Sequence, residues 1–416
     1  MRVAEAVGQA VADLGAGHAF GVVGSGNFAV TNALLAGGVP FVAARHEGGA
    51  ATMADAYART SGRCGVLTLH QGCGLTNAIT GITEAAKSRT PLLVLAADVA
   101  GSAVNSNFRI DQDALVRSVG AVPERIHSPA SALTDVQRAY RTAVQRRRTV
   151  VLNLPLDVQA AELPGSYRLD PVPASPRAAP APTAVGELAG LLEKADRPVF
   201  LAGRGALAYG PELAALAART GALLATSAVA AGTFVGEAYD LGICGGFATP
   251  LAAELIAGAD LLVAWGCSLT MWTTRHGRLV GADTVVAQVD DDLSALGARE
   301  PIHLGVLGDV GLTIEAVARS FEGGAPARDT EPRGSRSGSN SKAAGSGCRT
   351  RICRRRAPST RARSRSGWTS CCPPPASWRS TQATSWATRR RTCPCRHRGR
   401  SVSRNPSSRL ASVWPP

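Results

Sequence analysis

The sequence predicts an α/β protein with two doubly wound parallel-sheet domains and a basic tail in place of a third α/β domain. Three observations predict this class. Short aliphatic runs alternate with Ala-rich amphipathic segments of helical length over residues 1–162, and again over residues 185–322. A segment with six prolines, residues 163–184, separates the two series as a linker. Both periodicities stop after residue 322, so we expect residues 323–416 to be a low-complexity, disordered tail.

In the first series, the aliphatic runs are of strand length and continuously apolar, as in a parallel sheet covered on both faces. The predicted strands are Ala19–Val23, Phe41–Ala44, Val66–Leu69, Leu92–Ala96 and Thr149–Leu152. The predicted helices between them include Gly48–Arg59, Leu75–Ala86 and Thr134–Gln145. We therefore expect strands alternating with helices throughout this domain.

The second series repeats the pattern. Its predicted strands are Val199–Ala202, Leu223–Ala225, Leu261–Trp265 and Thr284–Val289. Its predicted helices lie near Pro211–Thr220 and Leu251–Ala257. The alternation indicates a second, Rossmann-like α/β domain.

Charge is distributed unevenly along the chain. Residues 331–416 carry 20 of the 45 Lys and Arg residues and one of the 31 Asp and Glu residues, a net charge of +19. Residues 1–330 therefore have a net charge of −5. Only the tail would suit an anionic partner, and it contains no recognisable nucleic-acid-binding module, so we expect no nucleic acid partner.

Neither the start of the chain nor its apolar runs resemble a targeting or membrane segment. No long apolar stretch follows Arg2, and runs such as Leu92–Ala97 are too short to cross a bilayer. The four cysteines of residues 1–330 are scattered and do not form the pattern of a disulfide framework. We expect a cytoplasmic protein that does not bind membranes.

Three junctions between a strand and a helix carry polar or glycine-rich motifs. Residues 20–27 read Phe-Gly-Val-Val-Gly-Ser-Gly-Asn, residues 45–51 read Arg-His-Glu-Gly-Gly-Ala-Ala, and residues 71–77 read Gln-Gly-Cys-Gly-Leu-Thr-Asn. A single carboxylate at a helix start, such as Glu47, is ordinarily a charge favoured by the helix dipole. Three such junctions in this order, followed by the Ser-Arg-Thr-Pro motif of residues 88–91, weigh against a purely local role for Glu47.

Together these motifs resemble the pyrimidine-binding domain of thiamine-diphosphate-dependent enzymes, in the group of acetolactate synthase and the 2-oxo acid decarboxylases. The resemblance covers residues 3–158 and continues more weakly through the second domain. It implies that Glu47 activates the cofactor by hydrogen bonding to the aminopyrimidine ring, which then accepts the thiazolium proton. It also implies cofactor contacts from Gly24, Gly72, Gly74 and Asn77.

Two further residues match benzoylformate decarboxylase, a member of this group. Ser25 and His70 lie where that enzyme has a serine and a histidine that act on the substrate. His70 would shuttle protons there, or it is a strand-end histidine whose hydrogen bonds are made by the backbone. Ser25 would contact the substrate, or it is a turn serine that caps the following helix.

Other residues favour acetolactate synthase. Phe108 and Gln112 lie where that enzyme has substrate residues near the reacting centre, although Arg109 replaces a glutamine and Cys73 replaces a proline. The resemblance implies a 2-oxo acid substrate and a homo-oligomer, a dimer or tetramer. FAD is possible in the second domain, whose residues 203–205 read Gly-Arg-Gly, but it is not favoured because the arginine-bearing pattern of FAD-binding members is missing.

The diphosphate of the cofactor is held through Mg²⁺ by a third domain in this group, and no residues of this chain match its Gly-Asp-Gly signature. We therefore predict that the chain contains no metal site and is impaired as an enzyme. The tail has three interpretations: a nucleic-acid-binding extension, a linker, or a GC-rich gene read in the wrong phase. We favour the third, because the neighbouring frame of residues 381–388 and 403–415 permits glycine-containing strings typical of a cofactor domain.

Overall fold

The computed structural model describes residues 1–174 and 176–322. The predictions about the basic tail lie outside these residues. Within them the chain forms two sheets of six strands each, and every strand pair in both sheets is parallel. The predicted fold class of two parallel α/β domains is confirmed.

The first sheet has the order β2-β1-β3-β4-β6-β5. Its strands are β1 (His18–Gly21), β2 (Phe41–Ala43), β3 (Gly65–Leu69), β4 (Leu92–Asp98), β5 (Val122–Arg125) and β6 (Thr149–Pro155). The helices are α1 (Val3–Asp13), α2 (Phe28–Ala36), α3 (Glu47–Ser61), α4 (Cys73–Lys87), α5 (Gln112–Ser118), α6 (Ala132–Gln145) and α7 (Leu156–Ala160). All five strands predicted for this domain are present, and β5 is an additional edge strand.

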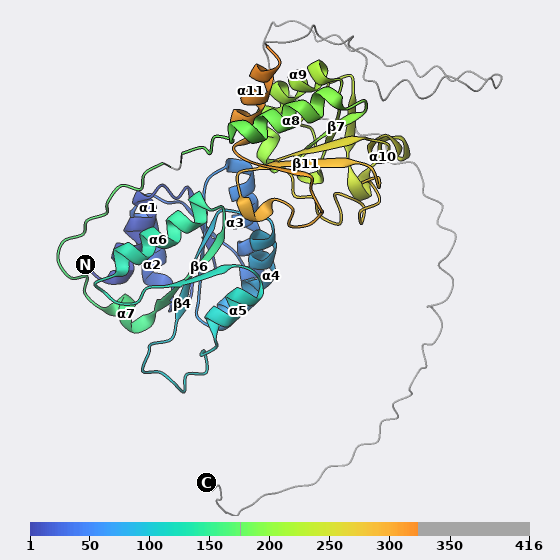
Figure 1. The fold of residues 1–416 in the computed structure, drawn as a ribbon. Helices are drawn as coiled ribbons and strands as arrows, with labels where there is room; N and C mark the ends of the chain where they lie inside the picture. Colours follow the sequence, from blue (N-terminus) through green and yellow to red (C-terminus); the bar gives the residue numbers. More distant parts are fainter. Residues whose placement is uncertain (175, 323–416) are drawn as a thin grey trace, which may run out of the picture. The chain divides into compact units, whose positions relative to one another are not determined.

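Helices cover both faces of this sheet, as Figure 1 shows. Alternate residues of the central strand β4 point to opposite faces, because side chains in a strand alternate. Leu93 and Leu95 pack in one buried cluster with residues of α1, α2 and α6. Leu92 and Val94 pack in the other with residues of α3 and α4. Burial on both faces explains why this strand is continuously apolar.

The second sheet has the order β12-β11-β10-β7-β8-β9. Its strands are β7 (Pro198–Ala202), β8 (Leu223–Thr226), β9 (Asp240–Ile243), β10 (Leu261–Trp265), β11 (Val285–Asp290) and β12 (Leu304–Leu307). The helices are α8 (Pro182–Lys194), α9 (Gly210–Thr220), α10 (Pro250–Ala257) and α11 (Val310–Ser320), with short 3₁₀ turns including η1 (Arg204–Tyr209) and η4 (Leu293–Ala295). The four predicted strands are present, and β9 and β12 lie at the two edges.

No helix in the described part of the chain is long and apolar enough to cross a membrane. The longest described helices, α3 and α4, have 15 residues each, and both cover the first sheet.

Candidate functional site

The first sheet has a topological switch point between β1 and β3. The chain leaves β1 toward β2 on one side, whereas β3 pairs with β1 on the other side. The loops that follow these strands therefore lie at the carboxyl edge beside the switch point, the place where α/β folds bind ligands in a crevice. All predicted site residues of this domain follow the carboxyl ends of β1, β2, β3 or β4.

Ser25 and His70 meet across this switch point. Ser25 Oγ lies 3.3 Å from His70 Nε2, and His70 Nδ1 lies 3.1 Å from the carbonyl oxygen of Gln71. A carbonyl only accepts hydrogen bonds, so Nδ1 carries the hydrogen in that contact. In the neutral ring, Nε2 is then the acceptor and Ser25 is the donor. The His70 ring is thus oriented with a basic nitrogen toward an exposed hydroxyl.

The approach of His70 depends on the glycine beside Ser25. A Cβ atom at position 24 would overlap His70 Cδ2. The Gly24 N–H donates to Asn27 Oδ1 at 2.8 Å, and the fully buried Asn27 also donates to the Thr68 hydroxyl at 2.8 Å. Asn27, which the sequence analysis did not single out, therefore ties the loop after β1 to β3.

Glu47 is the first residue of α3, where a negative charge is favoured by the helix dipole. The preceding residue, His46, caps the helix through Nδ1, which accepts from the Gly48 N–H at 3.0 Å. Asn77 of α4 donates from Nδ2 to Glu47 Oε2 at 3.0 Å. A Cβ atom at Gly74 would lie 3.8 Å from the other carboxylate oxygen, Oε1. The carboxylate is thus held on one side, and a glycine borders the other.

Phe108 lies against His70, with the ring centroids 5.2 Å apart in an edge-to-face arrangement. The Phe108 backbone also leaves no space for a side chain at position 72, because a Cβ atom there would overlap the Phe108 carbonyl oxygen. Gly72 has a φ of 61°, which L-residues rarely adopt. Glycine is therefore required at this position for two independent reasons.

Gln112, the other predicted substrate residue, is buried beneath this turn rather than exposed at the crevice. Its side chain bonds to Gly72 and Asn153. Asn153 lies within the apolar strand β6, where a lone amide was the signal that sequence reasoning could have used. The structure thus brings Ser25, His70 and Phe108 together and places Gln112 behind them.

The second sheet has its own switch point, between β7 and β10. A Cβ atom at Gly205 would lie 2.9 Å from Gly266 Cα, and the Gly205 N–H donates to the Gly266 carbonyl at 3.1 Å. The glycines of the Gly-Arg-Gly motif therefore serve a close approach between two backbone loops.

The acidic run after β11 has local hydrogen-bonding roles. Asp292 caps η4 by accepting from the Ser294 N–H at 2.9 Å, and Asp290 accepts from the Asp292 N–H at 3.1 Å. Burial raises the pKa of Asp290. Among residues 1–174 and 176–322, no group of three His, Cys, Asp or Glu side chains is arranged to hold a metal ion.

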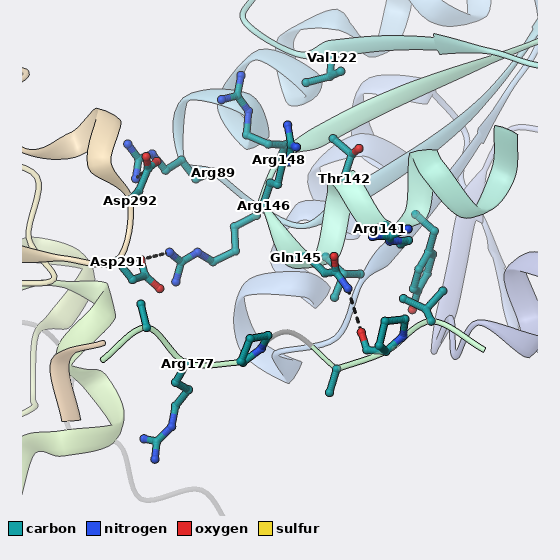
Figure 2. Close-up of a pocket in the computed structure, with 18 of the residues that line it drawn as sticks. Arg89, Val122, Arg141, Thr142, Gln145, Arg146, Arg148, Arg177, Asp291 and Asp292 are labelled. Carbon is teal, nitrogen blue, oxygen red and sulfur yellow. Dashed lines mark hydrogen bonds and ion pairs between the residues drawn. The ribbon is translucent and has the colours of Figure 1, made fainter. Parts of the chain in front are cut away.

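Several arginines gather where α6 ends (Figure 2). Gln145 donates from Nε2 to the Pro173 carbonyl at 3.0 Å. This bond holds the linker segment that precedes α8 against the end of α6. A hollow in the surface lies here, and Arg141, Arg146 and Arg148 are among the residues that line it. Positive charge is favourable at a helix C-terminus. The predicted site residues, all of them described, are not among those lining the hollow.

Glycine-rich and polar loops at the carboxyl edge of a parallel sheet are an arrangement in which many α/β proteins bind cofactors. Residues 1–115 match the family described as thiamine pyrophosphate enzyme, N-terminal TPP binding domain, and residues 185–317 match its central domain. By these two domains, the chain belongs to the thiamine pyrophosphate enzyme family. The resemblance found in the sequence motifs is confirmed.

Curated proteins with similar sequences are named for three different enzyme activities. A probable 2-ketoarginine decarboxylase of Pseudomonas aeruginosa is 31% identical over 80% of this chain and 60% of its own length. A sulfoacetaldehyde acetyltransferase of Rhodobacter capsulatus is 29% identical over 76% and 55%. A probable acetolactate synthase large subunit of Methanocaldococcus jannaschii is 28% identical over 74% and 54%. The chain thus spans a little over half the length of these relatives.

Proposed function

We propose that the chain derives from a thiamine-diphosphate-dependent decarboxylase or carboligase of 2-oxo acids, similar to acetolactate synthase. The observation that carries the proposal is the arrangement at one sheet edge: Glu47 held by Asn77, next to the Ser25–His70 pair. When bound, thiamine diphosphate supplies a carbon nucleophile and an electron sink for decarboxylation. The cofactor is that of the family, and the Glu47 carboxylate at this edge would hold it.

Each side chain has a task in this proposal. Glu47 holds the aminopyrimidine through its carboxyl group, and Asn77 orients that carboxyl. Gly74 carries no side chain next to Oε1, so this oxygen would be open to the aminopyrimidine. His70 Nε2 exchanges a proton with the substrate or with Ser25, whose hydroxyl binds the substrate carboxylate or carbonyl. Phe108 presents an exposed apolar ring beside His70, against which an apolar part of the substrate would pack.

We further propose that this polypeptide alone binds the cofactor weakly and turns over little, because its sequence carries no match to the family's diphosphate and magnesium signature. Isothermal titration of the full chain with thiamine diphosphate and Mg²⁺ tests this. We expect a dissociation constant well above the micromolar range, and micromolar binding would contradict the proposal.

The nucleotide sequence of the gene tests the origin of the tail. If the neighbouring frame stays open past the Pro416 codon and encodes Gly-Asp-Gly downstream, the tail is a product of a shifted reading phase. A frame that closes before that point removes the explanation.

A second candidate is a benzoylformate-decarboxylase-like enzyme, which the contact between Ser25 and His70 supports because that enzyme has a serine and a histidine at the matching strand ends. A third is a non-catalytic relic or partner subunit in the cytoplasm. Turnover of aromatic rather than short aliphatic 2-oxo acids, after co-expression with an intact homologue, would favour the second candidate over the first.

We propose that the first domain forms a homo-oligomer through α3 and α4. The exposed residues of these two helices up to Ala56 and Thr80 are uncharged and include Gly49, Thr52, Thr76 and Asn77, whereas the exposed charged residues Arg59, Glu84 and Lys87 lie toward the helix ends. Such a surface suits close packing against a second copy or an intact homologue. Size-exclusion chromatography of the chain, alone and after that co-expression, tests this; a strictly monomeric chain that joins no partner would contradict it.

A further inference from the structure

A series of buried hydrogen bonds links the turn after β3 to the middle of β6. Gln112, at the start of α5, is only 2% exposed. Its Oε1 accepts from the Gly72 N–H at 2.9 Å, and its Nε2 donates to Asn153 Oδ1 at 2.7 Å and to the Ala97 carbonyl at 3.1 Å. Both amide hydrogens of Gln112 are therefore used by protein acceptors.

The direction of these bonds is set by charged groups at the far end of the series. Asn153 Nδ2 donates to Asp113 Oδ1 at 2.6 Å, and Arg125 Nη2 lies 3.6 Å from the same oxygen. An ionised carboxylate only accepts, so Asn153 turns its NH₂ group toward Asp113 and its oxygen toward Gln112. Gln112 must then face Asn153 with its NH₂ group, which leaves its oxygen for Gly72.

Gly72 is held from two sides by the segment that follows β4. Its N–H is bound by Gln112, and the carbonyl of Phe108 occupies the space where a side chain would lie. Its φ of 61° places the peptide groups of the turn in one orientation. His70 is two residues away, and its Nδ1 is bound by the carbonyl of the intervening residue, Gln71.

We propose that Gln112 is a positioning residue: with Asn153, it fixes the Gly72 turn so that the His70 ring presents Nε2 to Ser25. The functional importance of the Ser25–His70 pair rests on the proposed function. The positioning of His70 by Gln112 is a property of the folded chain alone. Loss of the Gln112 amide frees the Gly72 N–H in a buried place, where an unmet donor is unfavourable. The turn is then expected to rearrange and to release His70 from its fixed tautomer.

The experiment compares Gln112→Met with a matched control, Gln159→Met. Gln159 is also a buried glutamine, 6% exposed, and donates from Nε2 to the Leu154 carbonyl at 2.7 Å without contacting the turn. The full chain is labelled with ¹⁵N-histidine, and the His70 ring signals are assigned with His70→Gln. Spectra are recorded near pH 8, where an ordinary imidazole is neutral.

We expect wild type and Gln159→Met to show His70 with hydrogen on Nδ1, and Gln112→Met to show a mixture of tautomers. Both methionine variants should lose thermal stability. Only the His70 spectrum therefore separates a specific effect on the His70 ring from a general loss of stability. An unchanged His70 spectrum in folded Gln112→Met, or equal changes in both variants, overturns the proposal.

Hydrogen exchange of wild type provides a test that needs no variant to fold. The Gly72 amide should exchange slowly, since it is buried and bound to Gln112, and rapid exchange would overturn the proposal. None of these measurements uses the cofactor. A negative result here therefore leaves the cofactor titration unaffected, and strong or weak cofactor binding does not alter this outcome.

Discussion

At the scale of single residues, the site depends on glycines that leave space for other side chains. Gly24 gives space to His70, and Gly72 accepts both the Phe108 carbonyl and a positive φ. Polar residues behind them, Asn27 and Gln112, bond to the backbone of these glycines. His70 and Phe108 can therefore lie where they do because the residues next to them are glycines, which have no side chain.

Gly24→Ala should displace His70 and destabilise the fold by about 1–3 kcal/mol, because the new Cβ atom would overlap the ring. Gly186→Ala in α8 is the matched control, since nothing lies within 4 Å of its added Cβ. The control should raise stability by about 0.5–1 kcal/mol through helix propensity. Urea unfolding measures both, and equal effects of the two substitutions would contradict this account.

At the scale of elements, α3 and α4 place Glu47 and Asn77 by packing closely. Their contact is made near Gly81 of α4, where an added Cβ atom would lie 2.5 Å from the Cβ of Ala51. Glu47 and Asn77 lie at the starts of the same helices. The distance between the two helices therefore sets the hydrogen bond between these side chains.

Gly81→Ala should push the two helices apart and cost about 1–3 kcal/mol of unfolding free energy. The matched control is Gly190→Ala in α8, which has open space around the added atom and should be stabilising. Equilibrium denaturation gives the free energies. A Gly81→Ala protein as stable as wild type would show that the helices do not need this contact distance.

The start of α6 is stabilised by a buried carboxylate. Burial alone would raise the pKa of Asp135, but hydrogen bonds from the His127 N–H, the Ser131 hydroxyl and Arg138 outweigh it and lower the pKa. A lowered folded-state pKa stabilises the protein at pH values above the unfolded value of about 3.9. That contribution is lost as the pH falls from there through the folded-state value.

Asp135→Asn should therefore reduce stability at pH 7 by about 1–3 kcal/mol, since a charged acceptor of several hydrogen bonds is removed. The difference from wild type should shrink as the pH falls below about 4. Asp170→Asn, at an exposed ion pair with Arg168, should change stability by less than about 1 kcal/mol. Denaturation from pH 7 to 3 measures this, and a difference that grows on acidification would refute it.

At the scale of the whole molecule, the described core lies within residues 1–322. Four buried clusters, two on each sheet, contain side chains from Val3 to Val317. The basic tail contributes charge, and the two domains contribute the apolar surface that drives folding.

Truncation after residue 322 should leave the thermal midpoint of the two domains unchanged, because the described clusters stay intact. It should also remove any salt-sensitive binding to DNA, which we expect to come only from the net charge of the tail. Differential scanning calorimetry and a DNA titration at two salt concentrations test these two expectations. A lower midpoint for the truncated chain would show that the tail supports the fold.

Sequence reasoning identified the strands with continuous apolar runs and missed elements with weaker patterns. The edge strands β5 and β9 were not predicted, because polar residues and a proline interrupt their apolar runs. The edge strand β12 was also missed, and its Leu-Gly-Val-Leu sequence contains a glycine, which strands disfavour. The helix α2 was missed because its apolar residues surround it, with Phe28 and Leu35 exposed while Val30 and Leu34 are buried. Its sequence therefore lacks the polar face of an amphipathic helix.

The sequence by itself determined the two parallel α/β domains, the family and the junctions that carry Glu47, Ser25 and His70, because periodicity and glycine-rich turns are local properties. Only the tertiary structure decided which of these residues meet. The pair of Ser25 and His70 is separated by 45 positions, and the bond from Gln112 to Gly72 by 40. Strand order brings such residues together, and that order follows from packing of the whole domain rather than from any single segment.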